Sequence, residues 1–194
     1  NNNNENNEIA EALKLCEFAL NIKNNNFDAI ILKCDILISQ NKLEEALKEV
    51  ENLGNFYILK EKENNENNEN INNNNNNNSL EEGKPEEFNE LISIIFIKKA
   101  NILKKLNKLE EAFIFYEKAE KLNYSMDEIY YGKALIYSIQ KNYLEANELF
   151  DKAILHNPFS KDIFFGKAIV LQELNKFEEA LEKLNKVINI YKNP

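Results

Sequence analysis

Few side chains in this sequence could carry out chemistry. His156 is the only histidine, and Cys16 and Cys34 are the only cysteines. No motif pairs a serine or cysteine nucleophile with His156, and no cysteine–histidine spacing matches a metal site. Arginine does not occur among the 194 residues, which excludes guanidinium clamps for phosphate or carboxylate groups. We therefore predict a protein that is not an enzyme and that has no metal ion and no cofactor.

These three residues favour packing roles instead. His156 falls at the end of a helical pattern, and both cysteines fall in apolar positions of such patterns, where a thiol is buried and inert. Two thiols in a chain of this size do not form a disulfide framework. A reducing compartment follows, and we expect the protein to be cytoplasmic.

The charge balance restricts the class of partner. The chain has 24 basic and 33 acidic residues, for a formal net charge of -9. An acidic surface repels the phosphates of nucleic acids and anionic lipid headgroups. No apolar run reaches the roughly 20 residues that a membrane-spanning helix needs. We therefore expect a protein or peptide partner, with neither nucleic acid nor membrane binding.

A short segment recurs along the chain. The letters NKLEEA begin at Asn41 and again at Asn107, NKFEEA begins at Asn175, and KNYLEA begins at Lys141. The last three of these copies are spaced by 34 residues, whereas the first step is 66 residues. The sequence thus repeats one structural unit with a period of 34 residues, and one insertion of 32 residues interrupts it.

This period and its residue pattern resemble the tetratricopeptide repeat family. The position for a large residue holds Ile30, Phe96, Tyr130 and Phe164. The position for a small residue, where two helices come close, holds Cys34, Ala100, Ala134 and Ala168. The resemblance implies an all-α fold, a right-handed superhelical solenoid of antiparallel helix pairs. In such a hairpin Asn-Lys ends the first helix and Leu-Glu-Glu-Ala begins the second, where the helix dipole favours the glutamates.

The composition divides the chain into four parts. Residues 1–7 and 63–84 are asparagine-rich, and we expect both to be disordered because they offer little apolar surface to bury. Residues 8–62 hold one unpaired helix and one helix pair, and residues 85–194 hold three more pairs. The last helix carries Phe177, Leu181, Leu184, Val187 and Ile188, more apolar surface than one neighbour covers. We therefore expect the parent chain to continue past Pro194 with at least one more helix.

Stacked hairpins form a concave groove lined by the first helix of each pair. The resemblance implies that the groove-facing side chains lie one and five positions after the large residue. These candidates for a peptide-binding groove are Ile31, Asp35, Ile97, Asn101, Tyr131, Leu135, Phe165 and Ile169. Most are apolar, and packing against the next repeat or against a flanking helix of the parent protein would explain them equally well.

Two features depart from ordinary helix chemistry. A lysine replaces the family's leucine in all four pairs, at Lys33, Lys99, Lys133 and Lys167. We expect its stem to cover apolar surface while its ammonium group stays in water. Gly132 and Gly166 lie inside first helices, at a cost of about 1 kcal/mol each relative to alanine. Their repetition suggests that room is needed on that face, and duplication of the repeat alone would also explain it.

These patterns predict a non-catalytic protein-interaction scaffold that binds an apolar, net positively charged segment in the groove. Co-chaperone members of the family grip a C-terminal carboxylate with lysine, asparagine and arginine. Here Asn101 matches one such position, whereas Ile97, Gly132, Asp162 and Gly166 replace the others, so this is not that clamp. Two alternatives stay open. One is a regulatory or targeting region of a larger enzyme. The other is a helical-repeat nucleic-acid-binding protein, disfavoured by the period and the charge.

Overall fold

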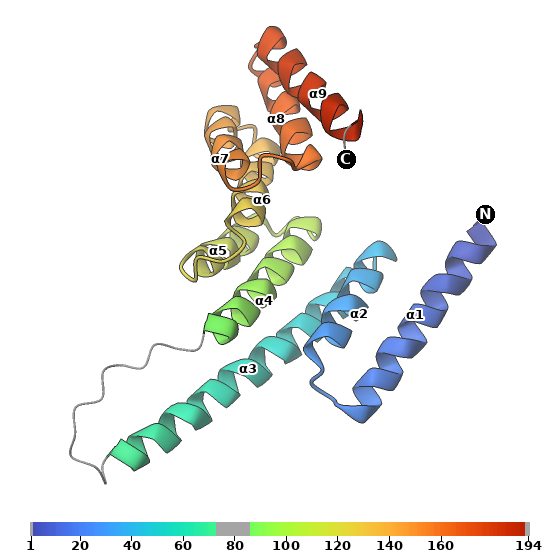
Figure 1. The fold of residues 1–194 in the computed structure, drawn as a ribbon, viewed down its shortest axis with the longest axis vertical. Coiled ribbons are helices and arrows are strands. Elements are labelled where there is room, and N and C mark those ends of the chain that lie inside the picture. Colours follow the sequence, from blue (N-terminus) through green and yellow to red (C-terminus); the bar gives the residue numbers. More distant parts are fainter. Residues whose placement is uncertain (1, 73–85, 193–194) are drawn as a thin grey trace.

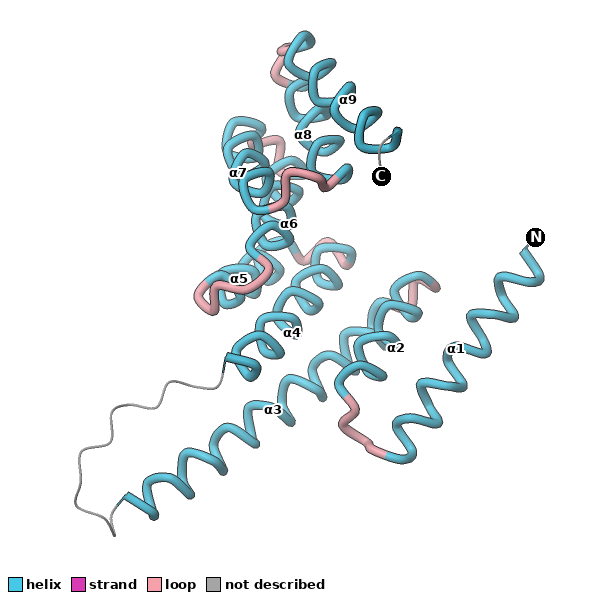
Figure 2. Tube along the Cα trace, in the orientation of Figure 1, coloured by secondary structure: helices cyan, strands magenta, loops and turns pink. Residues whose placement is uncertain are grey.

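The computed structural model describes residues 2–72 and 86–192, which form helices joined by short turns (Figure 1). The part of the chain so described contains no strand (Figure 2). Its helices are α1 (Asn2–Ile22), α2 (Phe27–Ser39), α3 (Leu43–Asn72), α4 (Glu86–Lys105), α5 (Leu109–Glu120), α6 (Met126–Ile139), α7 (Tyr143–His156), α8 (Lys161–Glu173) and α9 (Phe177–Lys192). None of these helices is both long and apolar enough to span a lipid bilayer.

The helices stack in pairs along a curved path that runs from α1 to α9 (Figure 1). The pairs are α2 with α3, α4 with α5, α6 with α7, and α8 with α9, and α1 packs against α2. First helices of successive pairs also contact each other directly, α4 with α6 and α6 with α8, which places them on the inner side of the stack. The predicted fold class, an all-α solenoid of antiparallel helix pairs, is confirmed.

The core consists of three apolar clusters, and each joins one pair to the next. The first combines residues of α2 and α3 with Ile95 and Ile102 of α4. The second combines α4 and α5 with Ile129 and Ile136 of α6, and the third combines α6 and α7 with residues of α8. No pair buries its apolar surface alone, so each pair is stabilised by its neighbours, as expected for a solenoid.

The repeated segment begins with the residue that reverses the chain. Asn41, Asn107, Lys141 and Asn175 all have positive φ angles, between 58° and 63°. In each turn the next residue donates a backbone hydrogen bond across the turn, as from Lys42 N to Leu37 O at 2.9 Å. This pattern closes a helix C-terminus. Asparagine tolerates the left-handed conformation better than other non-glycine residues, which explains why three of the four copies begin with it.

Two helices extend past the boundaries predicted from composition. The structure begins α1 at Asn2 rather than residue 8, and it continues α3 to Asn72 rather than ending near residue 62. Asparagine costs at most about 0.7 kcal/mol per helical residue, and extending a formed helix is far easier than nucleating one. Residue 1 and residues 73–84 of the predicted disordered segments lie outside the described residues.

Candidate functional site

The first helices place the predicted groove residues at different depths. Ile97 is 3% exposed and belongs to the second apolar cluster, so it offers almost no surface to a ligand. Asp35 is exposed but forms an ion pair with Lys98 of α4 at 2.6 Å. Ile31, Asn101, Tyr131 and Leu135 are half-buried, whereas Phe165 and Ile169 are exposed by 53% and 47%. The exposed apolar part of this row therefore lies on α6 and α8.

A hydrogen-bonded cluster joins three helices in the middle of the row. Tyr116 of α5 donates its hydroxyl hydrogen to Asn101 Oδ1 at 2.5 Å. The side-chain amide of Asn101 donates to Glu128 Oε1 of α6 at 2.9 Å. Burial raises the pKa of the Tyr116 hydroxyl well above its ordinary value, and the negative charge of Glu128 acts in the same direction. Tyr116 therefore stays a neutral donor that orients Asn101 and, through it, Glu128.

The two glycines of the first helices make room for aromatic rings. A Cβ atom on Gly132 would overlap the ring of Tyr116, and one on Gly166 would come within 2.7 Å of Phe150 Cζ. Each ring comes from the second helix of the preceding pair. The requirement for space that the sequence suggested at both positions is thus explained by ring packing, and Phe150 in turn supports the Tyr131 ring at 6.1 Å.

An acidic cavity of about 270 Å³ lies where α6 and α8 begin. Asp127, Glu128 and Asp162 contribute its carboxylates, and Tyr131, Ser160 and Ile163 complete the lining. Burial raises the pKa of the Tyr131 hydroxyl, and the charge of Asp162 raises it further. This cavity combines negative charge with an aromatic wall, which suits a basic side chain.

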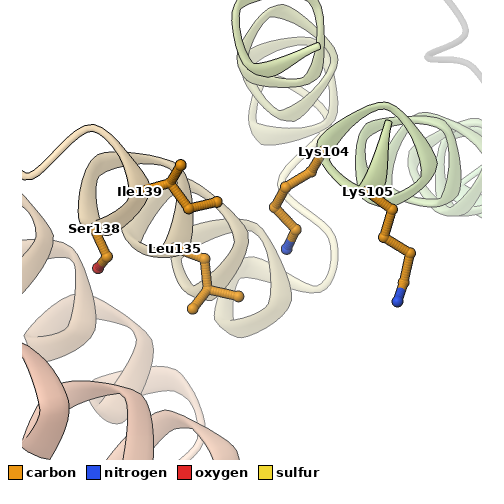
Figure 3. Close-up of a pocket in the computed structure, with 5 residues that line it drawn as sticks. All are labelled: Lys104, Lys105, Leu135, Ser138 and Ile139. Atoms are coloured by element: carbon orange, nitrogen blue, oxygen red, sulfur yellow. The ribbon is translucent and has the colours of Figure 1, made fainter. Parts of the chain in front are cut away.

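A second cavity, of about 410 Å³, lies between the last turns of α4 and α6. Leu135, Ser138 and Ile139 of α6 form one wall, and Lys104 and Lys105 form the other (Figure 3). Lys104 extends from α4 into the space beside Leu135 and Ile139, with Lys105 next to it at the end of the helix (Figure 3). The Ser138 hydroxyl donates to Ala134 O within its own helix at 2.8 Å, so the wall on α6 is mainly apolar.

Lys104 carries a half-buried positive charge. Burial lowers the pKa of its ammonium group to about 8, an effect that Glu128 partly opposes and Lys105 reinforces. Among the described residues no carboxylate forms an ion pair with Lys104 or Lys105. The ammonium group also lies 5.8 Å from the Tyr116 ring and 6.0 Å from the Tyr131 ring. These rings offer weak attraction but no charge neutralisation.

The repeated lysines hold successive helices together. Lys33 pairs with Glu49 at 2.7 Å and Lys99 pairs with Glu51 at 2.8 Å. The other two are buried: Lys133 pairs with Glu120, and Lys167 pairs with Asp151. The ammonium groups of Lys99 and Lys133 also lie over aromatic rings, 4.4 Å from the Phe115 centroid and 5.0 Å from the Phe113 centroid. The ammonium groups, however, bind carboxylates of second helices rather than water alone.

The remaining reactive residues have packing environments. Cys16 and Cys34 are buried free thiols, and burial raises the pKa of Cys34 to about 12. A thiol with so high a pKa is a poor nucleophile at neutral pH. His156 is exposed at the end of α7, with its ring 5.7 Å from that of Tyr130. Cys16 lies on α1, Cys34 on α2 and His156 on α7.

Sequence reasoning did not identify the cavity between α4 and α6. Its signal is a departure from the repeat. The two positions after the Leu103 slot hold Lys104 and Lys105, whereas the other three pairs hold uncharged or acidic residues there: Ile38 and Ser39, Ser138 and Ile139, and Gln172 and Glu173. A pair of cations in one repeat alone indicates a local role rather than a repeated structural one.

Comparison with solved structures shows proteins of the same fold. TTC0263, a thermophilic tetratricopeptide repeat protein of Thermus thermophilus, aligns with a TM-score of 0.64 and 14% identity over 95% of this chain and 84% of its own. MamA from Desulfovibrio magneticus RS-1 aligns at 0.60 and 12% identity, over 95% and 86%. A repeat protein from Parabacteroides merdae ATCC 43184 aligns at 0.58 and 19% identity, over 97% and 62%. No curated protein sequence matches significantly.

Sequence models give the family. Two models described as tetratricopeptide repeat match residues 4–56 and residues 95–125 and 127–158, which together make up more than half of the chain. These matches cover α1 and α2, the first part of α3, and most of α4 to α7. The chain belongs to the tetratricopeptide repeat family.

Proposed function

We propose that the chain is a non-catalytic scaffold that binds a segment of a partner protein on the concave face formed by α4, α6 and α8. The observation that carries this proposal is the row of half-buried and exposed apolar side chains on α6 and α8: Tyr131, Leu135, Phe165 and Ile169. Exposed aliphatic and aromatic groups on the inner face of a solenoid are typical of a site for an extended or helical segment.

The charges beside this row favour a partner segment with net positive charge. Asp127, Glu128 and Asp162 share the acidic cavity at the start of α6 and α8. Charges at the edge of an interface direct association and orientation, whereas the apolar contacts supply most of the affinity. The net charge of -9 adds long-range attraction for a basic segment.

A pull-down with the 194-residue chain tests this proposal. We expect Tyr131→Ala combined with Phe165→Ala to abolish capture of the native partner, because aromatic contacts at interface centres each contribute about 2 kcal/mol or more. The matched control is Phe159→Ala with Phe177→Ala, which removes two rings that are 75% and 62% exposed outside the groove. Circular dichroism verifies that helicity is unchanged. Full capture by the groove variant, or equal loss in the control, contradicts the proposal.

A further inference from the structure

We propose that the cavity between α4 and α6 binds an apolar side chain together with an adjacent aspartate or glutamate of the partner segment, whose carboxylate pairs with Lys104 and Lys105. This inference rests on the proposed function, and it specifies the order of charges in the partner. The groove would then recognise a segment that is acidic at one point and basic a few residues away.

The lining of the cavity matches that pair of side chains. Leu135 and Ile139 form an apolar wall opposite the two lysines (Figure 3), and about 410 Å³ is ample for a leucine-sized group. An apolar ligand alone would leave the Lys104 cation half-buried, with its desolvation offset only in part by Glu128. A ligand carboxylate beside the apolar group removes that cost, since a charge taken out of water is stable only when it is paired.

The lowered pKa of the Lys104 ammonium group is consistent with a site that binds an anion. Burial lowers this pKa to about 8, so the ammonium group is still charged at neutral pH. Desolvation of this charge therefore destabilises the folded chain. Lysines in the last turn of a helix ordinarily interact favourably with the helix dipole while their side chains remain exposed to solvent. Lys105 fits that ordinary role, because it is exposed. Lys104 is turned toward the apolar wall of α6 instead (Figure 3), where solvent screens its charge less.

The spacing between the apolar wall and the acidic cavity sets the distance between the apolar and the basic side chains of the ligand. Both cavities use α6: one is lined by Leu135 and the other by Glu128, seven residues earlier. At 1.5 Å per helical residue, Leu135 and Glu128 lie about 10 Å apart along the axis of α6. An extended segment spans that distance with about three residues. A basic side chain about three residues from the acidic–apolar pair would therefore reach Asp127, Glu128 and Asp162.

This arrangement differs from a C-terminal-carboxylate clamp in both residues and geometry. The clamp positions of the co-chaperone relatives correspond here to Ile97, Gly132, Asp162 and Gly166, which supply no cation. Lys104 and Lys105 stand in the last turn of α4, at sequence positions that the clamp does not use. A ligand that continues toward the acidic cavity also has no free C-terminus at the lysines. We therefore assign the carboxylate to a side chain inside the segment.

Fluorescence anisotropy with three synthetic peptides tests the inference. Each peptide is labelled, acetylated and amidated, so that a side chain is the only possible carboxylate. The first carries Asp-Leu with a lysine about three residues further on. The second has asparagine in place of aspartate, and the third has lysine there. We expect the 194-residue chain to bind the first peptide about tenfold more tightly than the second, and the third more weakly still.

Charge reversal in the protein should invert this order. Lys104→Glu with Lys105→Glu is expected to lose the preference for aspartate and to bind the peptide that has lysine in its place at least about tenfold better than the unaltered chain does. Lys121→Glu, a charge reversal at an exposed position outside the cavity, is the control and should keep the original order. Circular dichroism of each variant verifies folding, and Lys104→Met provides a milder change if the double variant does not fold.

The outcomes separate this inference from the proposed function. Equal binding of the aspartate and asparagine peptides, or an unchanged preference in the charge-reversed or Lys104→Met chain, overturns the inference and leaves groove binding in place. Failure of all three peptides to bind also overturns it. Only loss of partner capture in the control, or full capture by the Tyr131 and Phe165 variant, contradicts the groove itself.

Discussion

At the scale of single residues, the packing of Gly132 against the Tyr116 ring can be tested by making one substitution with the ring present and with it removed. Gly132→Ala should destabilise the fold by about 1–3 kcal/mol, because the added methyl group overlaps the Tyr116 ring and overpacking outweighs the gain in helix propensity. In a Tyr116→Val background the same change should stabilise it by up to about 1 kcal/mol. The first repeat already combines a smaller second-helix residue with a larger partner, since Val50 occupies the Tyr116 position and Lys98 the Gly132 position.

Denaturant unfolding of the two single variants and the double variant measures this reversal. Gly54→Ala serves as the matched control, since its Cβ would lie 3.4 Å from Ile95 Cγ2, an ordinary contact distance. That substitution should raise the free energy of unfolding through helix propensity alone. A Gly132→Ala penalty of the same size with and without Tyr116 would show that the ring is not the reason for the glycine.

Lys104 gives a pH-dependent prediction. Its pKa is about 8 in the folded chain and 10.5 ordinarily, so between these values the unfolded chain holds more protons and stability rises with pH. Lys104→Met should therefore raise the free energy of unfolding by about 2 kcal/mol at pH 7. The advantage should shrink as pH increases from 8 toward 10.5. The groups facing this ammonium are Glu128, Lys105, Tyr116 and Tyr131.

Urea unfolding of both proteins at several pH values tests this, because the difference between them cancels the titration of other lysines and tyrosines. A difference that stays constant from about pH 7 to pH 10 would mean that Lys104 keeps an ordinary pKa. Lys105→Met, at the exposed neighbouring position, should change stability by less than about 0.5 kcal/mol at each pH.

At the scale of helices, the two buried lysines form ion pairs that link α6 to α5 and α8 to α7. Lys133 of α6 is 5% exposed and pairs with Glu120 of α5. Glu120→Ala should cost about 1–3 kcal/mol, since it leaves a buried ammonium group without its acceptor. Adding Lys133→Met should recover most of that loss, because methionine needs no partner. Glu111→Ala, which removes an exposed pair 4.0 Å long, should cost less than about 0.5 kcal/mol. Thermal unfolding compares the four proteins, and no recovery in the double variant would contradict this account.

The helices and their pairing could be predicted from the sequence because every repeat carries the same signals. The turn residues, the small residues and the large residues recur at one spacing, so each repeat supports the interpretation of the others. The ends of α1 and α3 could not be predicted in this way. Their polar extensions at residues 2–7 and 63–72 have no apolar periodicity, and helix propagation from a packed segment decides where such a helix stops.

The candidate site was less predictable than the helices. A repeat position indicates which way a side chain points, but not how closely the neighbouring helix covers it. Ile97 and Phe165 occupy the same position, yet the first is buried and the second is half exposed. The cavity at Lys104 depends on the gap between the last turns of α4 and α6, a tertiary distance that no spacing within one helix encodes. Only the departure of Lys104 and Lys105 from the repeat pointed to it.

At the scale of the whole molecule, the shared clusters predict a gradient of stability along the solenoid. Helices between two neighbours are held on both sides: α5 buries Leu109, Ala112, Tyr116 and Ala119. In the described residues of α9, by contrast, only Ala180 is buried, and its main partner is α8. In a linear array each unit gains its stability from nearest-neighbour contacts, so a unit with one neighbour opens first.

Amide hydrogen exchange of the 194-residue chain measures this gradient of stability. We expect the amides of α9 to exchange at least about tenfold faster than those of α5 and α6, since each increment of about 1.4 kcal/mol in opening free energy changes the rate tenfold. Phe177, Leu181, Ile188 and Tyr191 are the large exposed side chains of α9, so a partner or peptide that covers them should slow exchange there. A groove ligand should instead protect α4, α6 and α8. Uniform protection from α2 to α9 would show that the stack unfolds as one unit, with the coupling between clusters stronger than their separate stabilities.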